Sequence, residues 1–182
     1  GTYALDAGTT ASNCIAIGYN SLTTNTTGNS NTAIGVASLE LNTTGAQNTA
    51  LGSSAMSANT TGNYNVAVGR LALGANTTAS ENTSVGAESL ENNQTGQQNC
   101  AFGFRALEDN DANHNTALGH EALKENTTGT QNTAVGADIM LVNTTGSNNV
   151  AMGFKALDAN TTASENVAIG AFSLSANTTG TQ

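Results

Sequence analysis

The sequence predicts an all-β fold, a parallel β-solenoid whose 17-residue coils form one single domain over residues 1–182. A glycine returns every 17 residues, except that the step from Gly103 to Gly119 is 16 residues. A period this short and strict is typical of a solenoid of about ten stacked coils. The glycines of this row are Gly1, Gly18, Gly35, Gly52, Gly69, Gly86, Gly103, Gly119, Gly136, Gly153 and Gly170.

Three segments make up each coil. The segment that ends at the glycine, such as residues 31–35 (Asn-Thr-Ala-Ile-Gly), is predicted to be a strand, because β-branched residues alternate with smaller ones. The segment after the glycine, such as residues 121–125, is predicted to be a second strand or a single helical turn. The third segment, Asn-Thr-Thr-Gly at residues 25–28, is typical of a turn. The single deletion falls in this turn, in the coil of residues 103–118.

Stacking the repeats predicts which side chains point inward. The residue before the glycine is always apolar, as is the residue four positions after it; Ile34 and Leu39 are examples. The residue two positions before the glycine is alanine in every copy except Ser84, so we expect another piece of backbone to come close there. Burying an unpaired charge costs several kcal/mol. We therefore expect the two apolar rows inside and the charged residues, which avoid these rows, outside.

Asparagine recurs at two positions of the coil. One row opens the strand motif, as at Asn31, and the other opens the turn, as at Asn25. Stacked identical amides can form ladders. We expect each amide to donate a hydrogen bond to the carbonyl of the next in both rows.

The chain offers no set of catalytic, cofactor-binding or metal-binding residues, and we expect it not to be an enzyme. Cys14 and Cys100 lie five coils apart, about 24 Å at the usual strand spacing, which is too far for a disulfide. Both are expected to be small buried residues. Cys100 and His114 lie in adjacent coils but lack a third group for a nucleophilic site. His120 is expected to be a solvated surface residue.

Composition excludes several classes of partner. The chain has 4 basic and 13 acidic residues and a formal charge of −9, which disfavours binding to nucleic acid or to an anionic membrane surface. No apolar run approaches the roughly 20 residues of a membrane-spanning helix, so we expect no membrane insertion. The absence of Trp and Pro makes a conventional globular core unexpected.

The strand motif carries a family resemblance. The copies at residues 31–35, 65–69 and 166–170 resemble the Asn-Ser-Val-Ala-Ile-Gly repeat in the head domains of YadA-like trimeric autotransporter adhesins. The chain is also similar to the Asn-Thr-Ala-Ile-Gly repeats of tail-fibre-like surface proteins. The resemblance implies a left-handed parallel β-roll that is elongated, three copies of which associate side by side as a trimer.

Physical arguments also favour a homo-oligomer, with a trimer about the fibre axis as the simplest arrangement for a shaft. A 17-residue coil encloses only a thin core, so neighbouring chains would help to offset the ordering entropy. We expect the alanine row and the row of Thr or Val that begins each strand to provide a flat contact face. The latter row contains Thr32, Thr49, Val66, Thr83, Cys100, Thr116, Thr133, Val150 and Val167.

Nine turns match the acceptor pattern for N-linked glycans. The same Asn-Thr-Thr pattern is favourable turn chemistry, and we favour that interpretation, with glycosylation kept as a hypothesis. Asn82 also fits the acceptor pattern. The possible attachment residues in the turns are Asn25, Asn42, Asn59, Asn76, Asn93, Asn126, Asn143, Asn160 and Asn177.

Four aromatic residues just after their glycines, Tyr19, Phe104, Phe154 and Phe172, are candidates for a partner-contact or sugar-binding stripe. We favour the interpretation that they pack between chains.

Together these features predict an extracellular fibrous protein, an adhesive shaft or rigid spacer on a cell surface or virion. Repeated side chains would make weak multivalent contacts to a host surface or glycan receptor. The first alternative is a glycosylated extracellular filament that assembles end to end. The second is an ice-binding or carbohydrate-binding solenoid, although the paired threonines lie in turns. We expect residues 1–182 to be a section of a longer fibrous protein.

Overall fold

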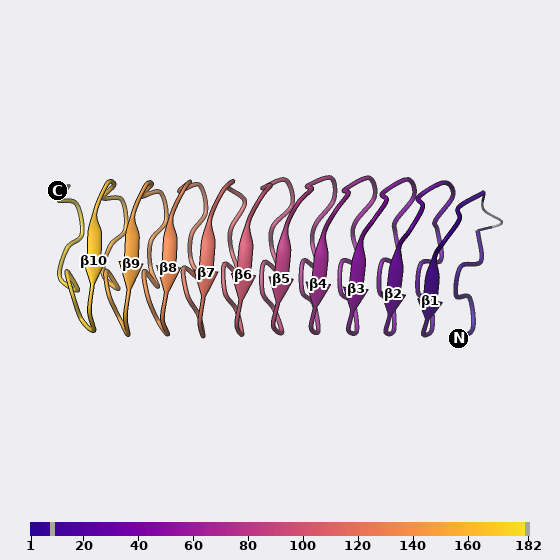
Figure 1. The fold of residues 1–182 in the computed structure, drawn as a ribbon, viewed down its shortest axis with the longest axis horizontal. Helices are drawn as coiled ribbons and strands as arrows, with labels where there is room; N and C mark the ends of the chain where they lie inside the picture. The colour runs from indigo at the N-terminus through magenta and orange to yellow at the C-terminus, as the bar shows by residue number, and fades with distance from the viewer. Residues whose placement is uncertain (8–9, 181–182) are drawn as a thin grey trace.

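The computed structural model describes residues 1–7 and 10–180, and in this part of the chain every regular element is a strand. The ten short strands follow one another in a single row, one per coil (Figure 1). They are β1 (Ile15–Ile17), β2 (Thr32–Ile34), β3 (Thr49–Leu51), β4 (Val66–Val68), β5 (Thr83–Val85), β6 (Cys100–Phe102), β7 (Thr116–Leu118), β8 (Thr133–Val135), β9 (Val150–Met152) and β10 (Val167–Ile169).

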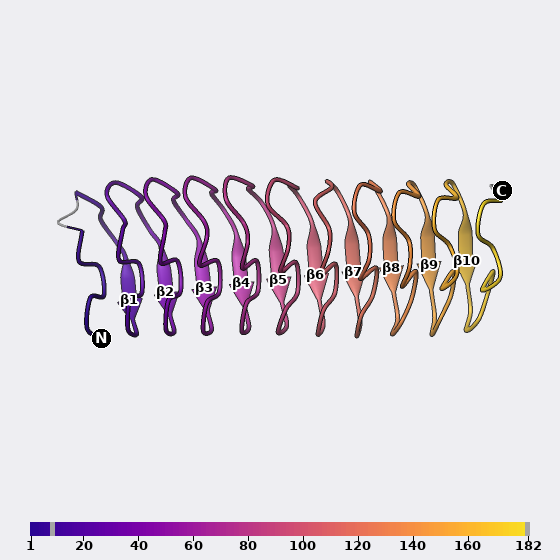
Figure 2. The same ribbon diagram turned by 180° about the vertical axis from the view of Figure 1, so that it is seen from behind.

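The strands form one parallel sheet in chain order, β1 to β10. Equivalent residues pair across it, for example Ala33 with Ala50 and Ala50 with Ala67. The register continues through the short coil, which we define as residues 103–118, because Cys100 pairs with Thr116. The view from behind shows the same row with the remaining segments of each coil stacked in step (Figure 2). The structure thus confirms a parallel β-solenoid with a 17-residue coil.

The segment after the glycine is neither the second strand nor the helical turn that was expected. It is a succession of turns in which two residues, such as Ala37 and Leu39, have φ of 58° and 49°. Left-handed backbone is unfavourable for a residue with a Cβ. Bonds between coils compensate, because the N–H of Leu39 donates to the carbonyl of Ala55 at 3.0 Å. Alternation of left-handed with ordinary backbone prevents either regular element from forming.

The core contains one of the two apolar rows that were predicted to be inside. The leucine row, four positions after the glycine, is confirmed as buried from Leu22 to Leu157. The row before the glycine is on the outside, so its predicted position was wrong: Ile169, for example, is 68% exposed. Strand side chains alternate between two faces. Because the central alanine of each strand points into the coil, both of its neighbours must point out.

The alanine row fills the space opposite the leucine row, and it is buried from Ala33 to Ala168. The one exception to alanine, Ser84, is buried as well. Its hydroxyl donates to the carbonyl of Ser89 at 2.8 Å, so its polar atom has a partner inside the coil.

The glycine after the strand is required for two reasons, as Gly35 illustrates. Its φ is 138°, and a Cβ there would meet the carbonyl oxygen of Gly52 in the next coil. Positive φ and a close approach of backbone are the two conditions that favour glycine, and this row has both.

The two asparagine rows differ in their bonding. In the turn row the predicted ladder is confirmed, because Asn42 Nδ2 donates to Asn25 Oδ1 at 2.8 Å. In the strand-motif row most bonds join side chain to backbone instead. Asn31 Nδ2 donates to the carbonyl of Gly45, and Asn31 Oδ1 accepts from the backbone N–H of Asn48. These amides therefore link each coil to the turn and strand of the next.

Candidate functional surfaces

We define the outer face as the first and third residues of the ten strands. Ala and Ser84 occupy the middle positions, which are turned inward. No strand residue carries a charge, and the third position is apolar in every strand. Large side chains are exposed along its length, including Ile17 at 56%, Leu51 at 44% and Met152 at 49%. The outer face is therefore a continuous, uncharged and mainly apolar surface along the ten strands.

Only part of the predicted contact face lies on this surface. The row of Thr or Val that begins each strand is there, with Val66 37% exposed. The alanine row is not, because its side chains are buried beneath the sheet. The third strand position also lies on this surface and was not part of the predicted face, although strict alternation with the alanine indicates that it shares a face with the Thr or Val.

The two cysteines are free thiols and are half-buried rather than fully buried. Cys14 lies in the strand-motif asparagine row, and its thiol donates to the carbonyl of Gly28 at 3.4 Å. Cys100 lies on the outer face, where partial burial raises the pKa of its thiol. No hydrogen bond joins Cys100 to the exposed His114 among the described residues.

Eight of the nine candidate glycan sites, Asn25 to Asn160 in the turn row, have fully buried side chains. Their Nδ2 atoms, which would carry a glycan, donate hydrogen bonds inside the coil, as Asn59 Nδ2 does to Asn42 Oδ1 at 2.7 Å. The ninth, Asn177, is half-buried and donates to the carbonyl of Gly180 at 2.9 Å. The burial supports the turn interpretation. Glycosylation of the folded chain would require these coils to open.

The four candidate aromatic residues are exposed but do not form one stripe. Tyr19 contacts the ring of Tyr3, with centroids 6.0 Å apart, near the N-terminal end. Phe154 and Phe172 contact each other in an edge-to-face arrangement near the C-terminal end. Phe104 lies between these two pairs, where the guanidinium of the following residue sits over its ring.

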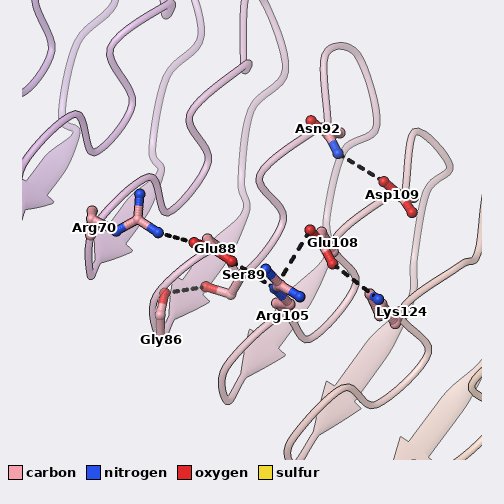
Figure 3. Close-up of polar contacts among 9 residues, drawn as sticks. All are labelled: Arg70, Gly86, Glu88, Ser89, Asn92, Arg105, Glu108, Asp109 and Lys124. Atoms are coloured by element: carbon pink, nitrogen blue, oxygen red, sulfur yellow. Dashed lines mark hydrogen bonds and ion pairs between the residues drawn. The ribbon is translucent and has the colours of Figure 1, made fainter.

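A network of ion pairs runs across four successive coils (Figure 3). Glu88 lies between Arg70 and Arg105 and makes an ion pair with each, with 2.6 Å from its Oε2 to Arg105 Nε. Glu108 continues the network to Arg105 at 3.7 Å and to Lys124 at 3.8 Å. Three of the four basic residues of the chain are therefore held here.

Glu88 corrects the expectation that charged residues lie outside. Its side chain is only 9% exposed, and the two guanidinium groups allow this burial because they satisfy the carboxylate. Glu91 lies close to Glu88 and Glu108. Burial, followed by the charge of Glu108, raises the pKa of Glu91.

His120 is exposed, as expected, but it has two partners. Its Nδ1 lies 3.3 Å from Asp138 Oδ1, and its ring lies against Phe104 with centroids 5.6 Å apart. Glu121 lies near both residues. One potential ligand atom from each of the three side chains lies within 4.8 Å of the other two. This group has no local signal in the sequence because Asp138 belongs to the next coil.

Comparison with known proteins adds no functional assignment: no family model, no curated protein and no solved structure matches the chain. Within the described residues there is no pocket and no helix with the length and apolar character needed to cross a membrane. The outer face and the charged groups beside it are therefore the surfaces from which function is argued.

Proposed function

We propose that the protein is a non-enzymatic, extracellular fibrous segment, a rigid spacer and multivalent contact surface on a cell or virion, built as an elongated trimer of left-handed β-rolls. The observation that supports this most strongly is the outer face. Ten strands present an uncharged and mainly apolar surface there. Contiguous exposed apolar surface is typical of protein contact sites. The resemblance to adhesin head repeats and tail-fibre-like proteins supports the same function.

Identical chains are the occupants that suit this face. Because its side chains repeat once per coil, a parallel copy would meet the same spacing along the whole sheet. The face also has no charge that would be desolvated on association. Closed symmetric assemblies are the usual form of homo-oligomers. Three parallel chains would cover their outer faces, while the ion pairs and turns would stay accessible to a receptor.

The experiment is a mass measurement in solution by analytical ultracentrifugation. The unmodified chain should sediment at three times the mass of one chain. Leu51→Lys and Leu118→Lys place charges on the outer face, where both leucines are more than 40% exposed, and each should shift the population to monomer. Thr44→Lys, on an exposed turn residue, is the matched control and should leave the trimer intact.

Other outcomes discriminate the alternatives. An open-ended series of masses would favour the end-to-end filament, and glycan mass on the turn asparagines would favour its glycosylated form. A monomer whose outer face stays exposed would contradict the trimeric shaft.

An ice-binding or carbohydrate-binding solenoid is the second candidate, and one observation favours ice binding. The first strand position is threonine in five of the ten strands, on the flat outer face rather than in the turns. The third position varies from Val to Phe and Met, which suits packing between chains better than a regular lattice. A monomer that inhibits ice recrystallisation, and loses this on Thr49→Lys, would favour ice binding.

A further inference from the structure

Two groups of potential metal ligands occur among the described residues, and they differ in the ion pairs that they form. The first consists of Glu88, Glu91 and Glu108, and the second of His120, Glu121 and Asp138. The first group is already neutralised by two arginines and a lysine. No lysine or arginine of residues 1–7 or 10–180 forms an ion pair with Glu121 or Asp138. Arg105 and Lys155 hold the equivalent places in the coils on either side, but neither forms an ion pair with Glu121 or Asp138.

The stacking of the coils brings the two carboxylates of the second group together. Glu121 and Asp138 each lie two positions after their glycine, with left-handed φ of 50° and 52°. They are half-buried and occupy equivalent places in adjacent coils. Like charges in equivalent places of neighbouring coils repel each other. A cation between them would relieve this repulsion.

Backbone hydrogen bonds hold both positions. The N–H of Asp138 donates to the carbonyl of His120 at 2.9 Å, and the N–H of Glu121 donates to the carbonyl of Phe104 at 2.9 Å. The ring of Phe104 lies beside the imidazole at an interplanar angle of 30°. The histidine side chain is thereby directed toward the next coil before any ligand binds.

We propose that His120, Glu121 and Asp138 bind one Zn²⁺ ion across two coils. Zinc accepts imidazole nitrogen and carboxylate oxygen in a tetrahedral arrangement. With bonds of about 2.1 Å, two ligand atoms of a tetrahedron are about 3.4 Å apart. His120 Nδ1 and Asp138 Oδ1 are 3.3 Å apart. Glu121 supplies the third ligand, and water takes the fourth position. A nitrogen ligand makes Ca²⁺ and Mg²⁺, which prefer oxygen, the poorer occupants.

The test is equilibrium dialysis of the folded chain against ZnCl2, with bound metal measured by mass spectrometry. The unmodified chain should bind one Zn²⁺, and His120→Ala or Asp138→Asn should weaken binding at least tenfold. The chain has only one other histidine, His114. His114→Ala is therefore the matched control and should bind as the unmodified chain does, as should Glu108→Gln from the first group.

A second measurement identifies the ligands independently. Co²⁺ in place of Zn²⁺ should give the visible absorption bands of a tetrahedral site, and these should be absent in His120→Ala. Far-UV circular dichroism checks that each variant is folded, which we expect because all three side chains are at the surface. Equal zinc binding by the unmodified chain and His120→Ala would overturn the proposal, as would no binding at millimolar zinc.

Discussion

The regular coils and the short coil provide different acceptors for the same backbone N–H groups of the neighbouring turn. In a regular turn the carbonyl oxygen of Thr60 accepts hydrogen bonds from three successive N–H groups, those of residues 43–45, at 3.0, 3.2 and 3.3 Å. The turn at residues 127–129 repeats this pattern with the carbonyl of Thr144. Each turn is thus closed by one backbone carbonyl from the next coil.

The short coil has one residue fewer and uses a side chain in place of that carbonyl. Asp111 Oδ1 accepts from the N–H groups of residues 94–96, at 2.9, 2.6 and 3.2 Å. A carboxylate carries more negative charge than a carbonyl, so it is a stronger acceptor. The comparison shows that a deletion in the turn is tolerated where an acidic side chain accepts from the backbone N–H groups that the deletion would otherwise leave unpaired.

The ladder of turn asparagines is stretched beside the short coil. From Asn76 to Asn93 and from Asn93 to Asn110 the Nδ2 to Oδ1 distances are 3.4 and 3.5 Å. The other neighbours between Asn25 and Asn160 are 2.7–2.8 Å apart. Hydrogen bonds of 3.4 and 3.5 Å are weak. The ion pairs of Figure 3 span the same coils, so charge reinforces the region in which the ladder is stretched.

The largest expected effect is a loss of unfolding free energy that differs between the regular and the stretched parts of the asparagine ladder. Asn59→Ala removes bonds of 2.7 and 2.8 Å to its neighbours and leaves buried polar atoms without partners, so we expect a loss of about 3 kcal/mol in unfolding free energy. Asn93→Ala removes only the stretched links and one bond to Gly96. It should cost about half as much, as measured by urea unfolding. Equal losses would contradict the difference between the two regions.

Replacement of the acidic acceptor comes next. Asp111→Ala leaves three backbone N–H groups without an acceptor, and we expect a loss of about 2 kcal/mol. Thr60→Ala is the matched change in a regular coil. It keeps the carbonyl and loses only the hydroxyl bond to Thr77, so it should cost under about 1 kcal/mol. If both variants unfold at the same urea concentration, Asp111 does not replace the carbonyl.

The ion pairs should contribute less than the hydrogen bonds. Glu88→Gln removes a buried charge from between Arg70 and Arg105. Because Arg70 is more than half exposed, solvent screening limits the expected loss to about 1 kcal/mol. Glu81→Gln, at an exposed residue bonded to Gln98, should change the unfolding free energy by under about 0.5 kcal/mol. A larger loss for Glu81→Gln than for Glu88→Gln would show that the ion-pair network adds no stability beyond that of an exposed carboxylate.

The smallest effect concerns Glu91 and depends on pH. Burial, then the charge of Glu108, raises its pKa above the ordinary 4.5, so the folded chain holds this proton more tightly than the unfolded chain. The resulting stability is fully present below pH 4.5 and is lost as pH rises through the raised pKa. Glu91→Gln should therefore be slightly more stable than the unmodified chain at pH 7 and equal to it at pH 4. Thermal unfolding at both pH values measures this, and a gap that widens on acidification would contradict it.

The sequence alone determined which residues are equivalent. Because the 17-residue period stacks the same position of every coil, it sufficed to predict the parallel solenoid, the strand at residues 32–34, the buried leucine row and the ladder that begins at Asn25. Alternation along the strand places the residue before the glycine on the same face as the Thr or Val, but it does not say which face points inward, because that depends on how the chain turns within one coil.

Only the tertiary structure decided which face of each strand points into the coil. Left-handed residues such as Leu39 are stabilised by bonds to the next coil, and these bonds are not visible in the local sequence. The same is true of Asp111, of the buried Glu88 and of the approach of Asp138 to His120. Each of them depends on contacts between residues of different coils. Periodicity shows which positions stack, but the path of the backbone between them sets which groups meet.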